Sequence, residues 1–363
     1  MKIGIDISQI AYPGFGVATY TQKLVETLLK IDKVNEYILF YSSMRRPLRT
    51  DFKGALIKKY RFPPTLLDII WNKLHILPIE TLIGKIDIFH SSNWVQPPVQ
   101  AKKVTTIHDM LIYKYPENIH PKIISTQKRQ LAWVKKECDL IIADSKATKD
   151  DIIEILGIPE EKIRVIYLAS GEEFREKQKE EKIEFVKKKY NLIGDYLLTV
   201  GSFEPRKNLS RIIKAYGGIK KTYKVSLVIT GQFRWGEKIK YQEGIHNLGF
   251  VEKNDLPALY AGSKVFIYPS LYEGFGLPVL EAQSCGCPVV TSDKGSLKEI
   301  TKDTAIVVDP ENAGDIQKGI EKILSMDKEA LINLKQKGVA HAGLFTWEKT
   351  ARETLEVYRE LTS

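Results

Sequence analysis

Two glutamates flank a glycine-containing loop in the stretch of residues 268–281. A predicted strand ends where the stretch begins, and Gly274 and Gly276 allow the backbone to approach a ligand closely. A proline then suits the first turn of a helix, whose free N–H groups favour an anion. The carboxylates of Glu273 and Glu281 would repel a bare phosphate, but they would accept hydrogen bonds from sugar hydroxyls. The pattern therefore predicts a site for a sugar nucleotide, and the alternative is a capped helix with a surface glutamate.

Two adjacent cations follow another predicted strand, in the segment that runs from Gly201 through Ser202 to Arg206 and Lys207. Fixed cations at a strand end can neutralise a diphosphate leaving group where no metal does so. The chain contains no Asp-x-Asp, Cys-x-x-Cys, His-Glu-x-x-His or phosphate-loop motif, and its histidines show no metal-ligand spacing. We therefore expect no metal and no other cofactor. The alternative is that Arg206 and Lys207 only solubilise the surface.

A third candidate lies near the start of the chain, where Gly14, Phe15 and Gly16 follow the first predicted strand. They match a dinucleotide-binding fingerprint only in part, because the third glycine and the acid expected to hold a ribose are missing. We interpret them as a flexible glycine loop facing the cleft, with a plain strand-to-helix turn as the alternative. His108 ends a further strand of the buried type, although a histidine at a strand end is often structural.

The elements that would position these residues are short Val/Ile/Leu runs alternating with helical patterns. Continuous apolar runs are typical of parallel strands buried on both faces. The sequence therefore predicts an α/β protein with two doubly wound Rossmann-like domains, at residues 1–172 and 173–345, and a final helix at 346–363. Ligands of such sheets bind outside the carboxyl ends of the strands, so the cleft between the domains is the expected site.

Composition excludes several classes of protein. The chain has 363 residues, of which 43% are hydrophobic and 28% charged, so it is globular and too long for one ordinary core. It has no uncharged apolar run of about 18 residues, which argues against a membrane span. An acidic residue at position 6 lies where a signal peptide needs an apolar run, which argues against a signal peptide. Three cysteines, an odd number, suit a reducing cytoplasm.

The net charge of +10 is concentrated at the front of the chain, because residues 1–135 hold 20 Lys and Arg against 10 Asp and Glu. Such a surface could meet anionic lipid, a phosphorylated substrate or nucleic acid, or it could simply be solvated. We expect domain one to dock on the inner face of the cytoplasmic membrane and so reach a lipid-linked acceptor. The basic residues expected to dock cluster around Leu48, Phe52, Leu56, Ile57 and Phe62, and they are Arg45, Arg46, Arg49, Lys53, Lys58, Lys59 and Arg61.

Taken together, these residues resemble the retaining glycosyltransferases of family 4, which have the GT-B fold. Glu273 and Glu281 resemble the family's Glu-x7-Glu signature, and Gly201 with Arg206 and Lys207 resembles its phosphate-binding turn. Further residues resemble the segment that holds the nucleobase, the first-domain glycine loop and the histidine beside the donor sugar. These are Phe250 and Val251, Gly14 to Gly16, and His108.

The resemblance implies transfer of a sugar from a nucleoside diphosphate sugar to a hydroxyl of a glycan or polyprenyl-linked acceptor, with retained anomeric configuration. Arg206 and Lys207 would stabilise the departing phosphate, helped by the amides of Phe275, Gly276 and Leu277. Glu281 would bind the ribose, Glu273 a hydroxyl of the donor sugar, and His108 the sugar itself. A front-side displacement, in which the leaving phosphate accepts the proton, is the mechanism usually proposed for the family.

The glycine loop and the His108-Asp109-Met110 segment look most like mannosyltransferases of bacterial surface polysaccharides, which favours GDP-mannose as donor. UDP-glucose, UDP-N-acetylglucosamine and dTDP-rhamnose remain open, because a basic residue common in that subgroup near position 18 is absent. Two other classes remain as rivals. A nicotinamide-dependent oxidoreductase should have the third glycine and the ribose acid, and a nucleic-acid-binding protein should have a recognisable binding module.

Overall fold

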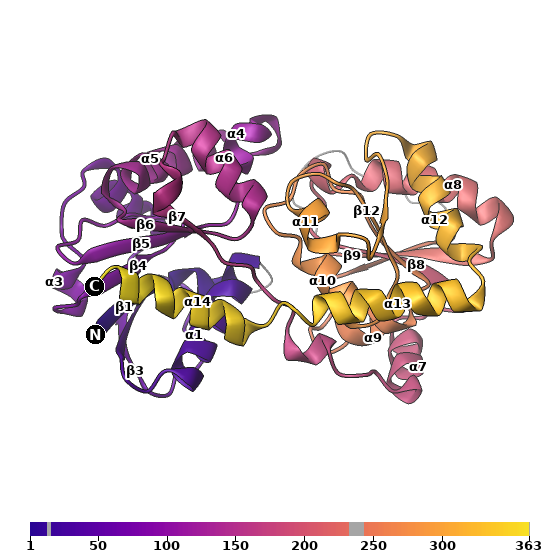
Figure 1. The fold of residues 1–363 in the computed structure, drawn as a ribbon, viewed down its shortest axis with the longest axis horizontal. Coiled ribbons are helices and arrows are strands. Elements are labelled where there is room, and N and C mark those ends of the chain that lie inside the picture. The colour runs from indigo at the N-terminus through magenta and orange to yellow at the C-terminus, as the bar shows by residue number, and fades with distance from the viewer. Residues whose placement is uncertain (13–15, 232–242, 363) are drawn as a thin grey trace. The chain divides into compact units, whose positions relative to one another are not determined.

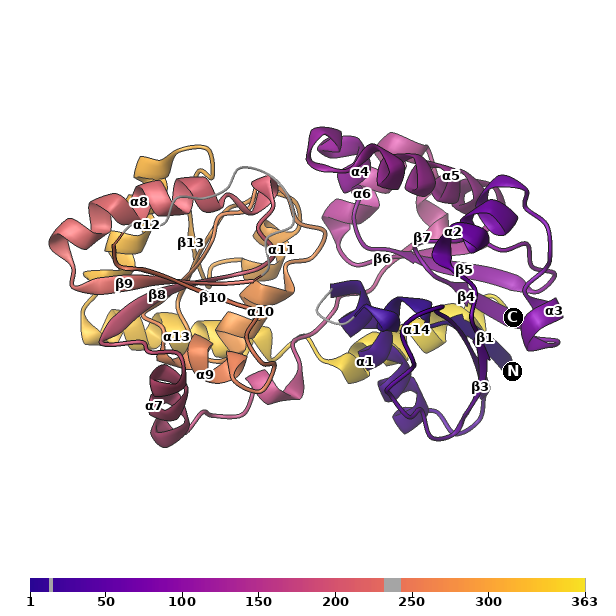
Figure 2. The same ribbon diagram turned by 180° about the vertical axis from the view of Figure 1, so that it is seen from behind.

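The computed structural model describes residues 1–12, 16–231 and 243–362 of the chain. It divides into two compact units, each with its own sheet (Figures 1 and 2). Unit 1 comprises Met1–Leu168 together with Trp347–Ser363, and unit 2 comprises Ala169–Thr346. The expected boundaries lie at residues 172 and 345.

Unit 1 is built on seven parallel strands in the order β3-β2-β1-β4-β5-β6-β7. Helices α5 and α6 cover one face of the sheet, and α1 and α14 cover the other (Figure 1). The strands are β1 (Lys2–Asp6), β2 (Glu36–Ser42), β3 (Ala55–Tyr60), β4 (Ile88–Ser91), β5 (Lys102–Ile107), β6 (Leu140–Ala143) and β7 (Ile163–Val165). The helices are α1 (Gly16–Ile31), α2 (Pro64–Leu67), α3 (Glu80–Ile83), α4 (Leu111–Lys114), α5 (Pro121–Glu137), α6 (Lys146–Leu156) and α14 (Trp347–Glu360).

Unit 2 repeats this architecture with six parallel strands in the order β10-β9-β8-β11-β12-β13. Helices α8 and α12 pack together on one face, and α9, α10 and α13 lie on the other (Figure 2). The strands are β8 (Asp195–Val200), β9 (Val225–Thr230), β10 (Ile245–Gly249), β11 (Val265–Tyr268), β12 (Val289–Thr291) and β13 (Ile306–Val307). The helices are α7 (Glu180–Lys189), α8 (Leu209–Thr222), α9 (Leu256–Gly262), α10 (Leu277–Ser284), α11 (Leu297–Thr301), α12 (Ala313–Leu324) and α13 (Lys328–Ala342).

Both sheets have the doubly wound form that the apolar runs predict, so the predicted fold class is confirmed. The strand order reverses between β1 and β4 in unit 1 and between β8 and β11 in unit 2. In open α/β sheets, the carboxyl ends of the strands at this switch point form the binding crevice. The fold therefore directs attention to the loops that follow β1, β4, β8 and β11.

The strand β3 is absent from the sequence-based prediction. Its sequence, ALIKKY, is half-exposed and carries two lysines, because it lies at the edge of the sheet and pairs only with β2. Natural edge strands often carry lysines, which discourage pairing with another chain. Such a strand lacks the continuous apolar run by which the buried strands were recognised.

Candidate active site

The adjacent parallel strands β8 and β11 deliver the charged residues of unit 2 to one place. Residues 201–208 follow β8, and residues 269–276 follow β11, at the switch point of the sheet. Arg206 and Lys207 form one turn of 3₁₀ helix, and the backbone N–H of Leu271 donates to the Arg206 carbonyl at 2.8 Å. The two loops predicted separately from sequence are therefore in direct contact.

Glu273 binds both cations through its two carboxylate oxygens. Its Oε2 lies 2.9 Å from Arg206 Nη1, and its Oε1 lies 2.6 Å from Lys207 Nζ. All three side chains are at most 16% exposed. Burial alone would raise the pKa of Glu273, but the two cations outweigh it and lower this pKa to about 2. Burial and the neighbouring Arg206 lower the pKa of Lys207 to about 8 although Glu273 opposes them.

Glu204 is a further member of this cluster, and the sequence analysis gave it no role. It is 6% exposed, and its Oε2 accepts a hydrogen bond from Arg206 Nε at 3.0 Å while Oε1 accepts from the Ser202 hydroxyl. The Lys207 ammonium also contacts the hydroxyl of buried Tyr268. The sequence signal that could have identified Glu204 is its position two residues before Arg206, in a loop that follows a strand. The tyrosine could be found only from the pairing of β8 with β11.

The loop then enters α10 through Gly276, which has a φ of +93°. A Cβ at this position would lie 2.8 Å from Leu297 Cδ2, so only glycine fits without a shift of the backbone or of that side chain. Phe275 is buried and packs edge-on against Phe345, and the Ser296 hydroxyl donates to the Phe275 carbonyl at 2.7 Å. Leu277, the first residue of α10, is partly buried. These contacts fix the loop that begins the helix, with Gly274 buried within it.

Glu281 lies on α10 in a different environment from Glu273. Its Oε2 accepts a hydrogen bond from the Tyr260 hydroxyl at 3.1 Å, and no cation lies within 4.0 Å of it among the described residues. Burial raises the pKa of Glu281 to about 7. This carboxylate is therefore poised to gain from new hydrogen-bond donors.

The residues predicted to hold a nucleobase follow β10. Phe250 is 67% exposed, whereas Val251 beside it is buried. A large exposed aromatic ring is a suitable platform for a planar base. Gly201 at the end of β8 donates its N–H to the Thr230 carbonyl at 2.9 Å and so holds the neighbouring strand end in place.

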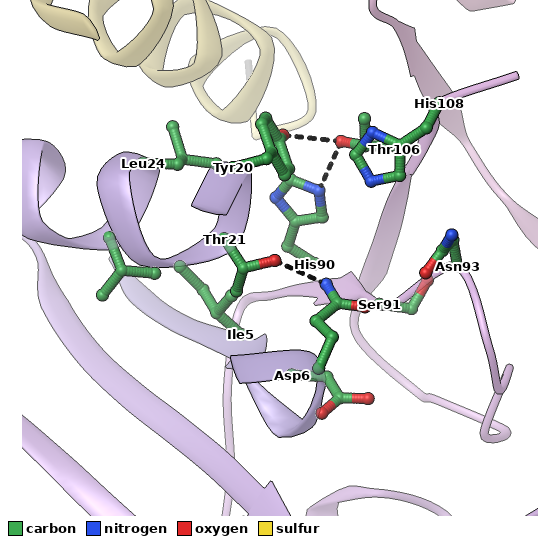
Figure 3. A pocket seen from close by; sticks show the side chains of 12 residues that line it. Ile5, Asp6, Tyr20, Thr21, Leu24, His90, Ser91, Asn93, Thr106 and His108 are labelled. Atoms are coloured by element: carbon green, nitrogen blue, oxygen red, sulfur yellow. Dashed lines mark hydrogen bonds between the residues drawn. The ribbon is translucent and has the colours of Figure 1, made fainter. Parts of the chain in front are cut away.

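Unit 1 has a pocket at its own switch point, and His108 is the predicted residue that lines it among the described ones (Figure 3). His108 follows β5, lines this pocket and contacts Asp144 through Nδ1 at 2.7 Å. The pocket is also lined by Asp6, Gln9, His90 and Asn93. Gly16 is the first residue of α1, whereas Gly14 and Phe15 lie outside the described residues.

No group of three or more His, Cys, Asp or Glu suited to hold a metal ion occurs among residues 1–12, 16–231 and 243–362. The acidic residues of the unit 2 site have different partners, since Glu204 and Glu273 pair with cations and Glu281 accepts a hydrogen bond from a tyrosine. What this arrangement can do is hold an anion at Arg206 and Lys207, with a carboxylate nearby for hydroxyl groups.

Most of the chain matches sequence models of glycosyltransferase families. The sequence model described as "Glycosyltransferase Family 4" matches residues 16–169, and "Glycosyl transferases group 1" matches residues 176–341. The O-antigen chain mannosyltransferase B of Escherichia coli is 31% identical over 386 residues, which cover 99% of this chain and all of that protein.

Solved glycosyltransferases share the fold over nearly the whole chain. Anabaena HepE in complex with UDP-glucose superimposes with a TM-score of 0.73 at 16% identity and covers 99% of this chain and all of its own. WaaG, a glycosyltransferase involved in lipopolysaccharide biosynthesis, gives 0.73 at 15% identity over 98% of this chain and 99% of its own. The two family models and the E. coli relative favour the glycosyltransferase prediction over an oxidoreductase or a nucleic-acid-binding protein. The chain belongs to glycosyltransferase family 4 and is a glycosyltransferase with the GT-B fold.

Proposed function

We propose that this enzyme transfers mannose from GDP-mannose, with retention of configuration, to a hydroxyl of a glycan or lipid-linked acceptor in the synthesis of a cell-surface polysaccharide. The observation that carries the donor site is the buried cluster of Arg206, Lys207 and Glu273 at the switch point of unit 2. The choice of mannose is supported by the name of the E. coli relative.

In this proposal, the diphosphate of the donor binds to Arg206 and Lys207 and takes the place that Glu273 occupies in the free protein. The carboxylate of Glu273 is then available to accept a hydrogen bond from a hydroxyl of the sugar. Ser202 and Glu204 hold Arg206 in place, and Glu281 accepts from the ribose. As the sugar–phosphate bond breaks, the two fixed cations stabilise the charge that develops on the phosphate. No step requires a proton from a protein side chain, because the leaving phosphate accepts the acceptor's proton.

A transfer assay with labelled donors tests the proposal. The enzyme is incubated with GDP-mannose, UDP-glucose, UDP-N-acetylglucosamine or dTDP-rhamnose and a bacterial lipid-linked glycan fraction, and the anomeric configuration of the product is read by NMR. We expect transfer from GDP-mannose to a product that keeps the donor's α-configuration. Transfer from another donor would overturn the choice of mannose, and a β-linked product would overturn retention.

Catalysis is expected to proceed without a divalent metal, because Arg206 and Lys207 supply the positive charge at the diphosphate. Product formation is measured after dialysis against excess EDTA and again after addition of Mg²⁺ or Mn²⁺. The expected rates are equal within error. Loss of turnover with EDTA and its recovery with metal would contradict this expectation.

Glu281→Ala is expected to weaken binding of the nucleoside diphosphate by about 10- to 100-fold, since hydrogen bonds to a charged group contribute about 1.5–3 kcal/mol. A carboxylate accepts from hydroxyls best when ionised, and the pKa of Glu281 is about 7. Affinity should therefore be full above pH 7 and fall as the pH drops through that value, with a flatter profile in Glu281→Gln. Calorimetry from pH 6 to pH 8 measures both effects.

The matched control for that experiment is the 2′,3′-dideoxy nucleotide, which has no ribose hydroxyls for Glu281 to bind. Its affinity should be the same in the unmodified protein and in Glu281→Ala. Equal losses for both nucleotides would show that Glu281 acts on the structure of α10 instead of on the ribose.

We also propose that unit 1 docks on a membrane. The structure changes which side chains can form the docking surface. Of the seven basic residues named above, six are exposed and Lys58 is half-buried. The expected apolar neighbours are less accessible, because Phe52 is buried and Phe62 packs against the core that contains Trp71. Among those neighbours only Leu56 is exposed.

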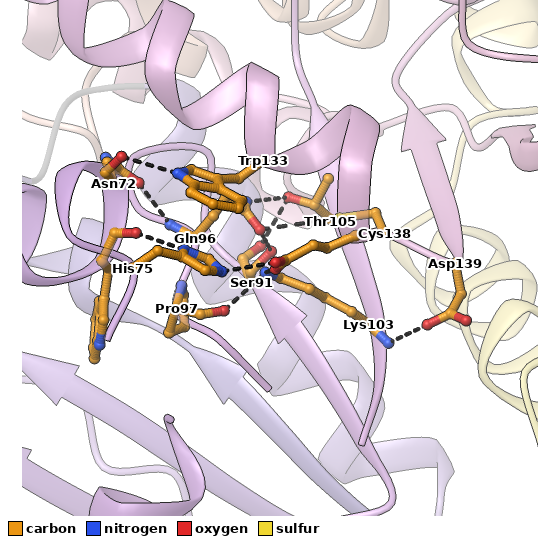
Figure 4. Close-up of polar contacts among 12 residues, drawn as sticks. Asn72, His75, Ser91, Gln96, Pro97, Lys103, Thr105, Trp133, Cys138 and Asp139 are labelled. Atoms are coloured by element: carbon orange, nitrogen blue, oxygen red, sulfur yellow. Dashed lines mark hydrogen bonds and ion pairs between the residues drawn. The ribbon is translucent and has the colours of Figure 1, made fainter. Parts of the chain in front are cut away.

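Exposed apolar side chains follow directly along the chain instead. The segment between α2 and α3 is anchored on α5, where the His75 ring stacks on Trp133 at 3.5 Å and the Trp133 indole donates to the Asn72 carbonyl (Figure 4). The side chains that this anchoring leaves exposed are Leu66, Ile69, Leu74, Ile76 and Leu77. The described residues include no helix that is both long and apolar enough to cross a bilayer. Basic charge beside exposed apolar groups suits the surface of an anionic bilayer.

The protein is therefore expected to co-sediment with liposomes, increasingly with anionic lipid and less as salt screens the charges. Each basic residue near the surface contributes about 1 kcal/mol. Replacing Arg45, Lys53, Lys59 and Arg61 by Gln should abolish binding, and Leu74→Ser with Ile76→Ser should weaken it. Arg46 is left intact because its guanidinium donates to the Ala11 carbonyl. If the unmodified protein does not co-sediment with anionic liposomes at low salt, a soluble acceptor is the better proposal.

A further inference from the structure

His108 and Asp144 are brought together by the pairing of two parallel strands in unit 1. The register pairs Ile107 at the end of β5 with Ala143 at the end of β6, so the next residue on each strand is His108 and Asp144. The His108 Nδ1 atom lies 2.7 Å from Asp144 Oδ2. The edge of the Tyr20 ring meets the imidazole, with ring centroids 4.8 Å apart. Nδ1 is thereby occupied, whereas Nε2 makes no hydrogen bond to any residue that the structure describes.

Asp144 is a deeply buried carboxylate, because its side chain is only 2% exposed. A buried carboxylate costs several kcal/mol unless a cation and hydrogen bonds compensate it. Its second oxygen, Oδ1, has no hydrogen-bond partner within the described part of the chain. The His108 ring is therefore the group that opposes the burial of this carboxylate, although burial still raises the pKa of Asp144 above its ordinary value.

His90 and His108 both line the pocket (Figure 3), but the charges around them shift their pKa values in opposite directions. Burial alone would lower the pKa of His108, but Asp144 and then the adjacent Asp109 outweigh it and raise this pKa above its ordinary value. Burial and the charge of His108 lower the pKa of His90 to about 3. Tyr20 stays neutral, because burial and Asp144 raise its pKa. The surrounding charges thus favour the protonated form of His108 and the neutral form of His90.

We propose that Asp144 is a positioning residue, which fixes the His108 ring through Nδ1–H and keeps Nε2 protonated as a hydrogen-bond donor to an oxygen of the substrate. This role rests on the proposed function, and it deepens it by deciding what His108 does. A histidine paired with a carboxylate could also serve as a general base towards the acceptor hydroxyl. A ring that already carries both protons cannot accept another, so His108 binds and orients the substrate and the leaving phosphate remains the acceptor of the proton.

Histidine NMR on the intact protein tests the pair without any substrate. The ring of His108 should titrate above the ordinary histidine value in the unmodified enzyme and below it in Asp144→Asn, where burial acts with little opposition. Asp109→Asn is the matched control, because it removes a nearby charge but no hydrogen bond to the ring, and it should cause a smaller fall. The His90 signal, which does not titrate near neutral pH, is the internal reference. The same titration in the unmodified protein and in Asp144→Asn would overturn the proposal.

Kinetics separate a positioning role from a structural one. At a pH between the two His108 titration midpoints that NMR gives for the unmodified enzyme and for Asp144→Asn, the variant should lower kcat by about 10- to 100-fold, the size expected for a lost charged hydrogen bond. This loss should shrink as the pH falls through the midpoint measured for the variant and His108 regains its proton, and Asp144→Glu should restore part of the activity. Rates are expressed relative to the unmodified enzyme at each pH, which cancels the titration of Glu281.

Two kinetic outcomes would overturn the proposal. A loss that is equal at every pH would mean that Asp144 only supports the fold, and a loss that shrinks as the pH rises would mean that His108 is a base. If no nucleotide sugar is turned over at all, the proposed function fails, while the NMR titration still decides whether Asp144 governs His108.

Discussion

Lys207→Ala is expected to lower kcat by about 10²–10³, the usual cost of removing one preorganised donor to a developing negative charge. Lys207 is 14% exposed and is held by Glu273 and by the ring of Tyr268, whose centroid lies 4.7 Å from the ammonium. Its position is therefore set before the donor arrives. Arg206→Ala should behave in the same way, because Glu204 and Glu273 hold its guanidinium from two sides.

Two matched variants show whether charge or geometry matters. Arg206→Lys keeps the charge but loses the Nε–H that donates to Glu204, so it should recover only part of the rate. Lys214→Ala removes an exposed cation from α8 in the same unit and should leave kcat unchanged. Steady-state kinetics on variants with native circular dichroism provide the comparison. Near-normal rates in both alanine variants of the cluster would mean that these cations lie outside the reaction site.

Glu273→Ala is expected to destabilise unit 2 by about 3–5 kcal/mol, because it leaves a buried cation without its counter-ion. Glu204 still pairs with Arg206, so Lys207 is the group left without a carboxylate. The pKa of Glu273 is lowered to about 2 from 4.5, so its contribution is present above about pH 4.5 and is lost as the pH falls towards 2. The difference from the unmodified protein should shrink accordingly in acid.

Hydrogen exchange followed by mass spectrometry localises this effect. Peptides from β8 and β11 should lose protection in Glu273→Ala, while peptides from β1 and β4 in unit 1 act as internal controls. A saturating nucleoside diphosphate should restore protection, since phosphate can replace the carboxylate beside the cations. Glu329→Ala, an exposed carboxylate on α13, should change little. Unchanged protection of β8 and β11 would contradict the idea that Glu273 neutralises Arg206 and Lys207 before the donor binds.

The sequence was sufficient for those parts of the fold and site that are encoded locally. Continuous apolar runs predicted the buried parallel strands, and Arg206, Lys207 and Glu273 were singled out because each follows such a run. The edge strand β3 was missed because its half-exposed sequence lacks that run. Whether a nearby apolar residue is available for docking depends on tertiary packing, and Phe52 is buried for that reason.

Contacts between distant segments were out of reach of the sequence. The ion pairs of Glu273 with Arg206 and Lys207 depend on the pairing of β8 with β11, and that of His108 with Asp144 depends on the register of β5 and β6. The hydrogen bond of Glu281 to Tyr260 joins two helices. Each contact shifts the pKa of its residue, so the electrostatics of the site follow from topology.

The most direct test of the account is a thermal-shift titration with nucleoside diphosphates and their sugars. A ligand at about 100 times its dissociation constant stabilises the folded protein by about 2.7 kcal/mol, which is readily measured. GDP and GDP-mannose should raise the melting temperature of the unmodified enzyme and of Lys214→Ala, and the rise should vanish when Arg206 and Lys207 are both replaced by alanine. If no nucleotide shifts the unmodified enzyme, or if the shift persists in the double variant, the donor does not bind at the Arg206–Lys207–Glu273 cluster and the central claim is wrong.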